Sequence, residues 1–178
     1  MQFLNFTDIA SIIGLEKNEA DYPGIIALEL SAIASINDYL YRDIVEKTLT
    51  ESFQENLNDL PLINLPVTIL SSVNRNGNVL VQDVDFKLRT WGIELINGAD
   101  GYNEIDVIYT GGYTQSSLPN GIYRALLIQT IYEWQNRDHI GSSSVTTEGG
   151  SVQRPQLSLL KEAMRILNIF RHPMRGQW

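Results

Sequence analysis

The stretch VIYTGGYTQSSLPNGIYRALLIQTIYEW, residues 107–134, decides the fold because its apolar pattern changes period partway along. Its first residues complete a run in which Ile105, Val107 and Tyr109 share one face, as in a half-buried strand. After Pro119 the apolar residues recur at helical spacing, and their broad arc predicts burial on more than one side. The stretch therefore predicts a strand, a corner and a helix in succession.

Two adjacent glycines at this corner raise the question of a phosphate site, because a glycine turn before a helix start can bind a phosphate. No Lys-Ser/Thr pair follows them, and a polar segment separates them from the proline that starts the helix. We predict a structural turn instead, since glycine tolerates positive φ. The residues of this turn are Gly111, Gly112, Tyr113 and Pro119.

Outward from this stretch, the pattern predicts one domain of 178 residues. The expected fold class is α+β and mainly helical: a helical bundle with a small antiparallel β-meander inserted between the N-terminal and C-terminal helices. The predicted segments are N-terminal helices at 1–46, a β-meander at 47–113, a central helix at 119–138, a flexible loop at 139–154, and a C-terminal helix and tail at 155–178.

Local signals place the elements more finely. Thr7 is the expected N-cap of a first short helix, and Gly14 is its expected stop. Asn76-Gly77 between two β-type runs predicts a hairpin. In the second helix, one face is predicted to be lined by Ile26, Leu30, Ile33 and Leu40.

Composition and charge exclude several classes of protein. The chain has no cysteine, so disulfides and thiolate metal sites are excluded. No apolar run is long enough for a membrane span, and the N-terminus lacks the basic residues of a signal peptide, so a cytosol-like compartment is expected. The net charge is −8, with an acidic balance in residues 1–118 and a basic one in 119–178. Electrostatic capture of nucleic acid by the whole chain is not expected; the basic third either docks on an acidic partner or carries no function.

No set of residues forms a catalytic constellation, so the chain is predicted not to be an enzyme and to hold no metal or cofactor. His139 and His172 lack a ligand partner at metal spacing and are expected to be exposed. Asp83 and Asp85 would share one strand face, where they could hold a cation weakly. A solvated pair at a strand end is the commoner arrangement of two such carboxylates.

The order of the motifs resembles that of the head–tail connector proteins of tailed bacteriophages, which are also called adaptor or head-completion proteins. DYLYRDI places Arg42 at the end of the second helix, and PVTILSSV followed by DVDFKL is similar to a hairpin of that family. The corner and helix match a V-x-Y-x-x-G-Y strand and its following helix at Val107, Tyr109, Gly112, Tyr113, Pro119, Ile122, Ala125, Tyr132 and Arg137. The similarity covers nearly the whole chain, and the segment 141–154 and the tail beyond Phe170 depart from the pattern.

The resemblance implies a structural virion protein that forms a ring beneath the portal, joins the DNA-filled head to the stopper or tail, and extends the DNA channel. The implied partners are the portal protein, a stopper or tail-completion protein, and further copies in a cyclic ring of about twelve subunits. DNA would pass through the channel without sequence-specific binding, and no membrane is involved. The implied location is the virion neck, after assembly in the host cytoplasm. Two alternatives stay open: another neck or tail completion protein, such as a stopper or tail terminator, and a non-viral small ligand-binding domain.

Two segments are expected to make the assembly contacts. The basic tail is predicted to contact the portal through Phe170, Arg171, His172, Met174, Arg175 and Trp178. The Ser- and Gly-rich loop is predicted to order on a neighbouring subunit or the next ring. Its contact residues would be Ser142, Ser143, Ser144, Val145, Thr146, Thr147 and Val152.

Overall fold

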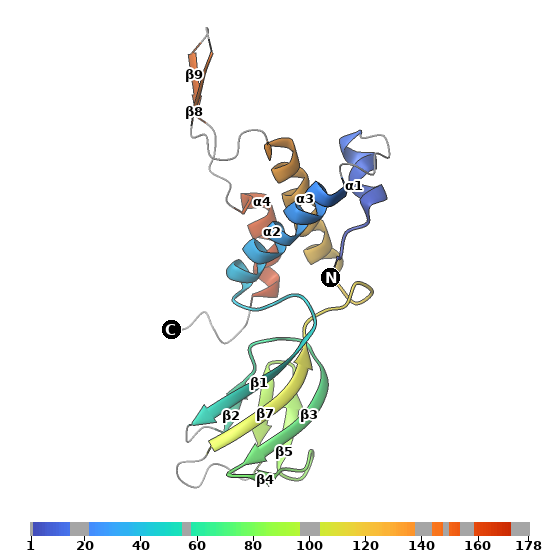
Figure 1. The fold of residues 1–178 in the computed structure, drawn as a ribbon. Helices are drawn as coiled ribbons and strands as arrows, with labels where there is room; N and C mark the ends of the chain where they lie inside the picture. The colour runs from blue at the N-terminus through green and yellow to red at the C-terminus, as the bar shows by residue number, and fades with distance from the viewer. Residues whose placement is uncertain are drawn as a thin grey trace. The chain divides into compact units, whose positions relative to one another are not determined.

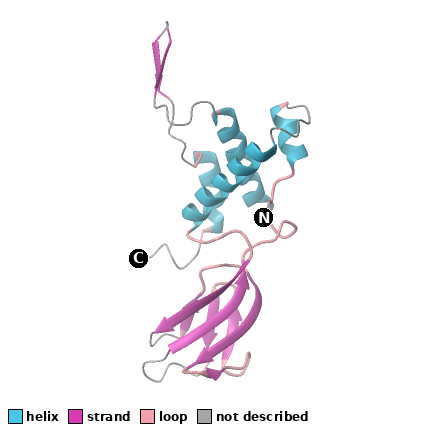
Figure 2. Cartoon of the chain, in the orientation of Figure 1, coloured by secondary structure: helices cyan, strands magenta, loops and turns pink. Residues whose placement is uncertain are grey.

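A computed structural model describes residues 2–14, 22–54, 58–96, 104–137, 144–147, 150–153 and 159–171 of the chain. The chain divides into two compact units. We call them the helical unit, Met1–Tyr39 and Leu118–Phe170, and the β unit, Leu40–Ser117 and Arg171–Trp178. Helices dominate the first unit and strands the second (Figure 2).

The described helices are α1 (Phe6–Ile13), α2 (Tyr22–Leu40), α3 (Asn120–Gln135), α4 (Lys161–Leu167) and the 3-10 helix η3 (Asn168–Phe170). α3 and α4 pack side by side in the helical unit (Figure 1). Gly121 in α3 leaves room for the ring of Phe170 in η3, because a Cβ there would lie 2.7 Å from that ring. None of the helices in the described part of the chain is long and apolar enough to cross a membrane.

α1 begins at a different cap from the predicted one. The Asn5 side chain accepts a hydrogen bond from the backbone N–H of Thr7 at 3.0 Å, so Asn5 is the N-cap and Thr7 lies inside the helix. The prediction of Thr7 was wrong because two good cap residues lie close together and asparagine is the stronger of the two. Gly14 ends the helix in the left-handed conformation, as the sequence predicts.

α2 buries only part of the predicted apolar stripe: Ile33 and Leu40 are buried as predicted, whereas Leu30 is not. Leu30 is 51% exposed, and the position beside it, Glu29, is buried. The Glu29 carboxylate accepts hydrogen bonds from the backbone N–H groups of Phe3 and Leu4 at 2.7 and 2.9 Å. A carboxylate with such partners can occupy a buried position that apolar periodicity assigns to another residue. The buried face of α2 consists of Ile25, Glu29, Ala32, Ile33, Ile36 and Leu40.

The strands of the β unit form two antiparallel sheets, which makes the expected fold class wrong. One sheet has the order β1-β7-β3-β4 and the other the order β2-β6-β5. Their bounds are β1 (Lys47–Gln54), β2 (Asp59–Pro61), β3 (Val67–Arg75), β4 (Asn78–Val79), β5 (Phe86–Arg89), β6 (Gly92–Leu95) and β7 (Glu104–Gly111). A helical bundle with a small inserted meander does not describe this unit, because β7 lies between β1 and β3. Turn signals predict pairing between consecutive strands and cannot reveal that long-range pairing.

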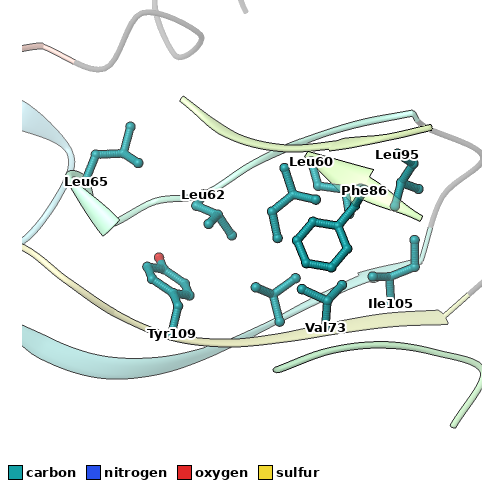
Figure 3. Packing of buried hydrophobic residues seen from close by; sticks show 10 residues of the cluster. Leu60, Leu62, Leu65, Val73, Phe86, Leu95, Ile105 and Tyr109 are labelled. Atoms are coloured by element: carbon teal, nitrogen blue, oxygen red, sulfur yellow. The ribbon is translucent and has the colours of Figure 1, made fainter. Parts of the chain in front are cut away.

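The core of the β unit lies between its two sheets (Figure 3). Along β7, exposure alternates, and the predicted inward face of Ile105, Val107 and Tyr109 is confirmed, with each side chain 0% exposed. Figure 3 shows Leu60 and Phe86 facing this layer from the other sheet. The remaining buried members of the cluster are Leu62, Leu65, Val73, Ile93 and Leu95.

Two turn predictions in the β unit have opposite outcomes. Asn76 and Gly77 both have positive φ, +51° and +82°, and join β3 to β4, so the predicted hairpin is confirmed. Asp83 and Asp85 do not share a strand face, because Asp83 has φ +65° and the segment turns before β5 begins at Phe86. The Asp85 carboxylate accepts the backbone N–H of Val81 at 2.8 Å, which stabilises that turn.

The predicted loop 139–154 contains a two-stranded antiparallel ribbon. β8 (Ser144–Thr147) pairs with β9 (Gly150–Gln153) through the register Ser144↔Gln153 to Thr147↔Gly150. The sequence did not indicate these strands, because Ser, Thr and Gly are typical of loops and only two valines mark the pairing.

Candidate functional site

The corner at the end of β7 is built around a close backbone contact. A Cβ on Gly111 would lie 2.1 Å from the backbone oxygen of Asn64, so no larger residue fits there. The Asn64 side chain donates a hydrogen bond to the Gly111 carbonyl at 2.7 Å, which holds the two segments together. Gly112 has φ +107°, a conformation that favours glycine. The glycines therefore have distinct structural tasks, space at Gly111 and a left-handed φ at Gly112.

The buried phenol of Tyr109 stabilises the same corner from the core between the two sheets of the β unit. The hydroxyl of Tyr109 donates to the Glu51 carboxylate and accepts the backbone N–H of Asn64 at 2.9 Å. Glu51 also accepts the backbone N–H of Ile63 at 2.9 Å. Burial, and then the hydrogen bond to Glu51, raise the pKa of Tyr109 well above its ordinary value. The phenol stays protonated at physiological pH, and the group of residues serves to fix the segment 62–66 over β7.

Two residues that carry the family resemblance meet beside this corner. The Arg42 guanidinium lies 5.9 Å from the centre of the Tyr113 ring and donates to the Leu65 carbonyl at 2.5 Å. The backbone N–H of Tyr113 donates a hydrogen bond to the carbonyl of Ile44, in the segment after α2, at 2.8 Å. Arg42 is only 9% exposed, so it contributes to the packing of the β unit and offers little surface to a partner.

Pro119, the fourth residue of the predicted turn, belongs to the helical unit and precedes α3. It has φ −58° and ψ 138°, and its carbonyl accepts the N–H of Tyr123 at 3.0 Å. An α3 start without a side-chain cap is compatible with proline, whose missing N–H would have no partner in the first turn. The predicted turn residues thus lie in two units, 111–113 in one and Pro119 in the other.

A buried polar pair on α3, which the sequence reading missed, fixes the start of α4. Gln129 donates to the Glu133 carboxylate at 2.9 Å and accepts the backbone N–H of Leu160 at 2.9 Å. Leu160 is the N-cap of α4 and makes no side-chain cap of its own. Gln129 and Glu133 are spaced i, i+4, which was the available signal, but a polar pair at this spacing usually lies on an exposed helix face.

The predicted portal-contact residues are described only in part. Phe170 packs on Gly121 and is therefore an anchor of the helical unit. Arg171 is exposed and lies 5.5 Å from the centre of the Tyr41 ring. Ile169, which the sequence did not single out, is 80% exposed. The other predicted contacts, His172, Met174, Arg175 and Trp178, lie outside the described residues.

The predicted neighbour-contact residues fall mainly on the ribbon. Ser142 and Ser143 lie outside the described residues, as does His139. The others are brought together by the pairing of β8 with β9: Ser144, Val145, Thr146, Thr147 and Val152. Val145 and Val152 are direct cross-strand partners in this ribbon. Across the described ranges, no group of three His, Cys, Asp or Glu side chains is placed to hold a metal ion.

Comparison with known proteins gives a fold but no family. No protein-family model and no curated protein matches the sequence. A chain in the neck of an empty gene transfer agent (GTA) particle, solved with C6 symmetry, matches with a TM-score of 0.61 and 16% identity over 95% of this chain and 89% of that chain. A chain in the virion of a native GTA particle matches with a TM-score of 0.65 and 13% identity over the same shares. A chain in the neck of a native GTA particle, solved with C12 symmetry, gives 0.55 and 16% over 83% and 81%. The likeness shows that this chain shares its fold with components of phage-like particles.

Proposed function

We propose that the chain is a structural protein of the neck of a tailed-phage-like particle, where it forms an adaptor ring beneath the portal. The observation that carries the proposal is the fold shared with chains of the GTA neck and virion over 95% of this chain. The order of sequence motifs leads to the same class of protein independently of the fold.

The chemistry of the chain suits a passive wall around DNA. The net charge of −8 repels phosphates, so DNA would slide through a channel lined by such chains without being held. The buried polar side chains of Gln129 and Asn64 fix the start of α4 and the β corner. A cyclic ring follows the common rule that homo-oligomers close on themselves, and the family resemblance implies about twelve copies in it. The neck structures with the same fold were solved with C6 and C12 symmetry, both of which are compatible with such a ring.

In this proposal the C-terminal tail binds the portal, and the segment 142–153 contacts a neighbouring subunit or the next ring. The tail follows Phe170, which packs on Gly121 in the helical unit. Arg171 and Arg175 give it the positive charge to meet an acidic portal surface. The stopper or the tail itself would bind the opposite side of the ring.

The test is co-assembly with the portal protein encoded in the same genome. Electron microscopy of the mixed proteins should show a ring of this chain on the portal. A chain lacking residues 172–178 should fold normally but fail to bind the portal in a pull-down. A chain in which these residues are replaced by a Gly/Ser tail of equal length is the matched control, and it should fail in the same way. A ring found only on tails or stoppers would assign the protein to that position instead, and binding that survives the deletion would remove the tail from the contact.

A further inference from the structure

The edges of the two sheets differ in how well they are protected against pairing with another chain. A strand edge offers unpaired N–H and C=O groups, and proteins usually blunt it by shortness, proline or charge. β4 has only two residues, and β2 has three and ends in Pro61. β5 has four, of which Lys87 and Arg89 are charged. β2, β4 and β5 therefore carry a recognisable protection. β4 covers only Asn74 and Arg75 of β3, and register shifts between Val67 and Ile69 and between Leu70 and Ser72 interrupt the pairing along the rest of β3.

β1 is longer than these edges, and its charged residues are Lys47 at its first position and Glu51, whose carboxylate is bound by the Tyr109 hydroxyl. It runs for eight residues and pairs with β7 in continuous register, without proline or bulge. Its other side has no partner strand within the described ranges, so alternate backbone groups between Thr48 and Phe53 point away from β7. The inward side chains Leu49 and Phe53 are only partly buried, whereas their partners Tyr109 and Ile105 on β7 are 0% exposed. A further strand beside β1 would complete both the hydrogen bonding and the burial.

The ribbon β8–β9 is a second incomplete sheet in the same chain. It has four residues on each strand and pairs with no other strand in the portion that the structure describes. An isolated two-stranded ribbon is marginally stable in water and gains stability from a third strand. The strand sequences SVTT and GSVQ carry no charge.

We propose that the outer edge of β1 accepts the β8–β9 ribbon of a second copy of the chain, as an added strand. The exposed β1 side chains are Lys47, Thr48, Thr50, Ser52 and Gln54. Only Lys47 among them is charged and the ribbon strands carry no charge, so the pairing sets no like charges opposite each other. An edge that meets a different segment of the next copy makes a heterologous contact, and such contacts form a ring when the rotation between successive copies closes. The inference rests on the proposed ring and names the contact that joins neighbours within it.

The absence of cysteine from the chain allows a direct test by disulfide cross-linking. One preparation carries Thr48→Cys, Thr50→Cys or Ser52→Cys singly, and a second, differently tagged preparation carries Thr146→Cys or Ser151→Cys. Thr146 and Ser151 are cross-strand partners, so the two variants probe both strands of the ribbon at one level. Mixing under oxidising conditions should give a cross-link between the two tags for at least one pair, because adjacent strands bring Cα atoms within disulfide range. The control replaces the β1 cysteine by Lys87→Cys on the charged β5 edge and should give several-fold less product.

The outcomes separate this inference from the proposed function. Mixed-tag products confined to the β1 pairs support the strand addition. Their absence from all pairs, or products only between two β1 cysteines, would overturn it, the latter by showing self-pairing of β1. Portal co-assembly is scored in parallel with the unmodified chain. A ring on the portal without mixed-tag products refutes only the strand addition, whereas mixed-tag products without portal binding refute only the adaptor role.

Discussion

The two units of the chain differ in the interactions that define their cores. The β unit buries a continuous apolar cluster between two sheets, and its corner depends on glycines that leave no space for a side chain. The helical unit also has an apolar core, and it buries the polar side chains Glu29, Gln129 and Glu133, which bind backbone N–H groups or one another near chain ends and helix starts. The β unit has such a buried polar side chain too in Asn64, so what sets it apart is the close backbone approach at Gly111.

The largest expected effect comes from filling the closest backbone contact of the β unit. Gly111→Ala would place a Cβ 2.1 Å from the Asn64 oxygen, and both backbones are held by the sheet and by the Asn64 side chain. We expect a loss of about 4 kcal/mol or more in the free energy of unfolding, measured by urea denaturation.

Gly14→Ala is the matched control for that substitution. Gly14 also ends an element, with φ +69°, but no atom lies within 4 Å of its hypothetical Cβ. The control should cost only about 1–2 kcal/mol, the strain of a left-handed alanine. A loss for Gly111→Ala no larger than that for Gly14→Ala would contradict the close contact between Gly111 and Asn64.

The second largest effect is expected from a substitution that removes a buried hydrogen-bond acceptor from the helical unit. Glu29→Ala leaves the N–H groups of Phe3 and Leu4 without their carboxylate, and each unsatisfied buried donor costs about 1–3 kcal/mol. We expect a loss of about 3 kcal/mol in unfolding free energy and faster amide exchange at Phe3 and Leu4. Asp38→Ala, on an exposed position of the same helix, should change stability by less than about 0.5 kcal/mol. Unchanged exchange at Phe3 and Leu4 would contradict the capping role of Glu29.

Local sequence signals were enough to predict the structure where a residue's environment is set by its own helix, strand or turn. The alternation of β7 and the Asn76-Gly77 hairpin could be read from the sequence, because side-chain direction in a strand and φ in a turn are local properties. The stop at Gly14 was predictable for the same reason.

Prediction from the sequence failed where the structure depends on contacts between segments that lie far apart in the chain. β1 pairs with β7, and no local signal records a partner so far along the chain. Glu29 and Gln129 read as surface residues until their backbone partners, Phe3, Leu4 and Leu160, are known. The candidate assembly surface was only half predictable: the segment 142–153 was singled out for its composition, whereas the open edge of β1 is visible only in the sheet order.

The third expected effect tests the hydrogen bonds inside the β corner. Tyr109→Phe keeps the buried ring but removes the hydroxyl that links Glu51 to the N–H of Asn64. The loss should be about 1–3 kcal/mol, the cost of buried groups left unpaired. Leu49→Ala, on the partly buried β1 residue opposite Tyr109, is a control for apolar loss at the same level of the sheet. It should leave the amide exchange of Asn64 unchanged, while Tyr109→Phe accelerates it; acceleration in both variants would assign the effect to packing.

The smallest expected effect is a pH-dependent one in the helical unit. The hydroxyl of Tyr123 on α3 donates to the Asp8 carboxylate on α1 at 2.7 Å. Burial, followed by this hydrogen bond, raises the pKa of Tyr123 from 10.0 to about 12. The protonated phenol is therefore favoured in the folded state, so its contribution is complete below pH 10.0 and is lost as the pH rises from there through about 12. Tyr123→Phe should cost about 0.5–1 kcal/mol near pH 7, a value typical of a partly exposed hydrogen bond. Urea unfolding near pH 11 should show a smaller difference between wild type and variant, and a difference that stays constant with pH would refute the titration of Tyr123 as its source.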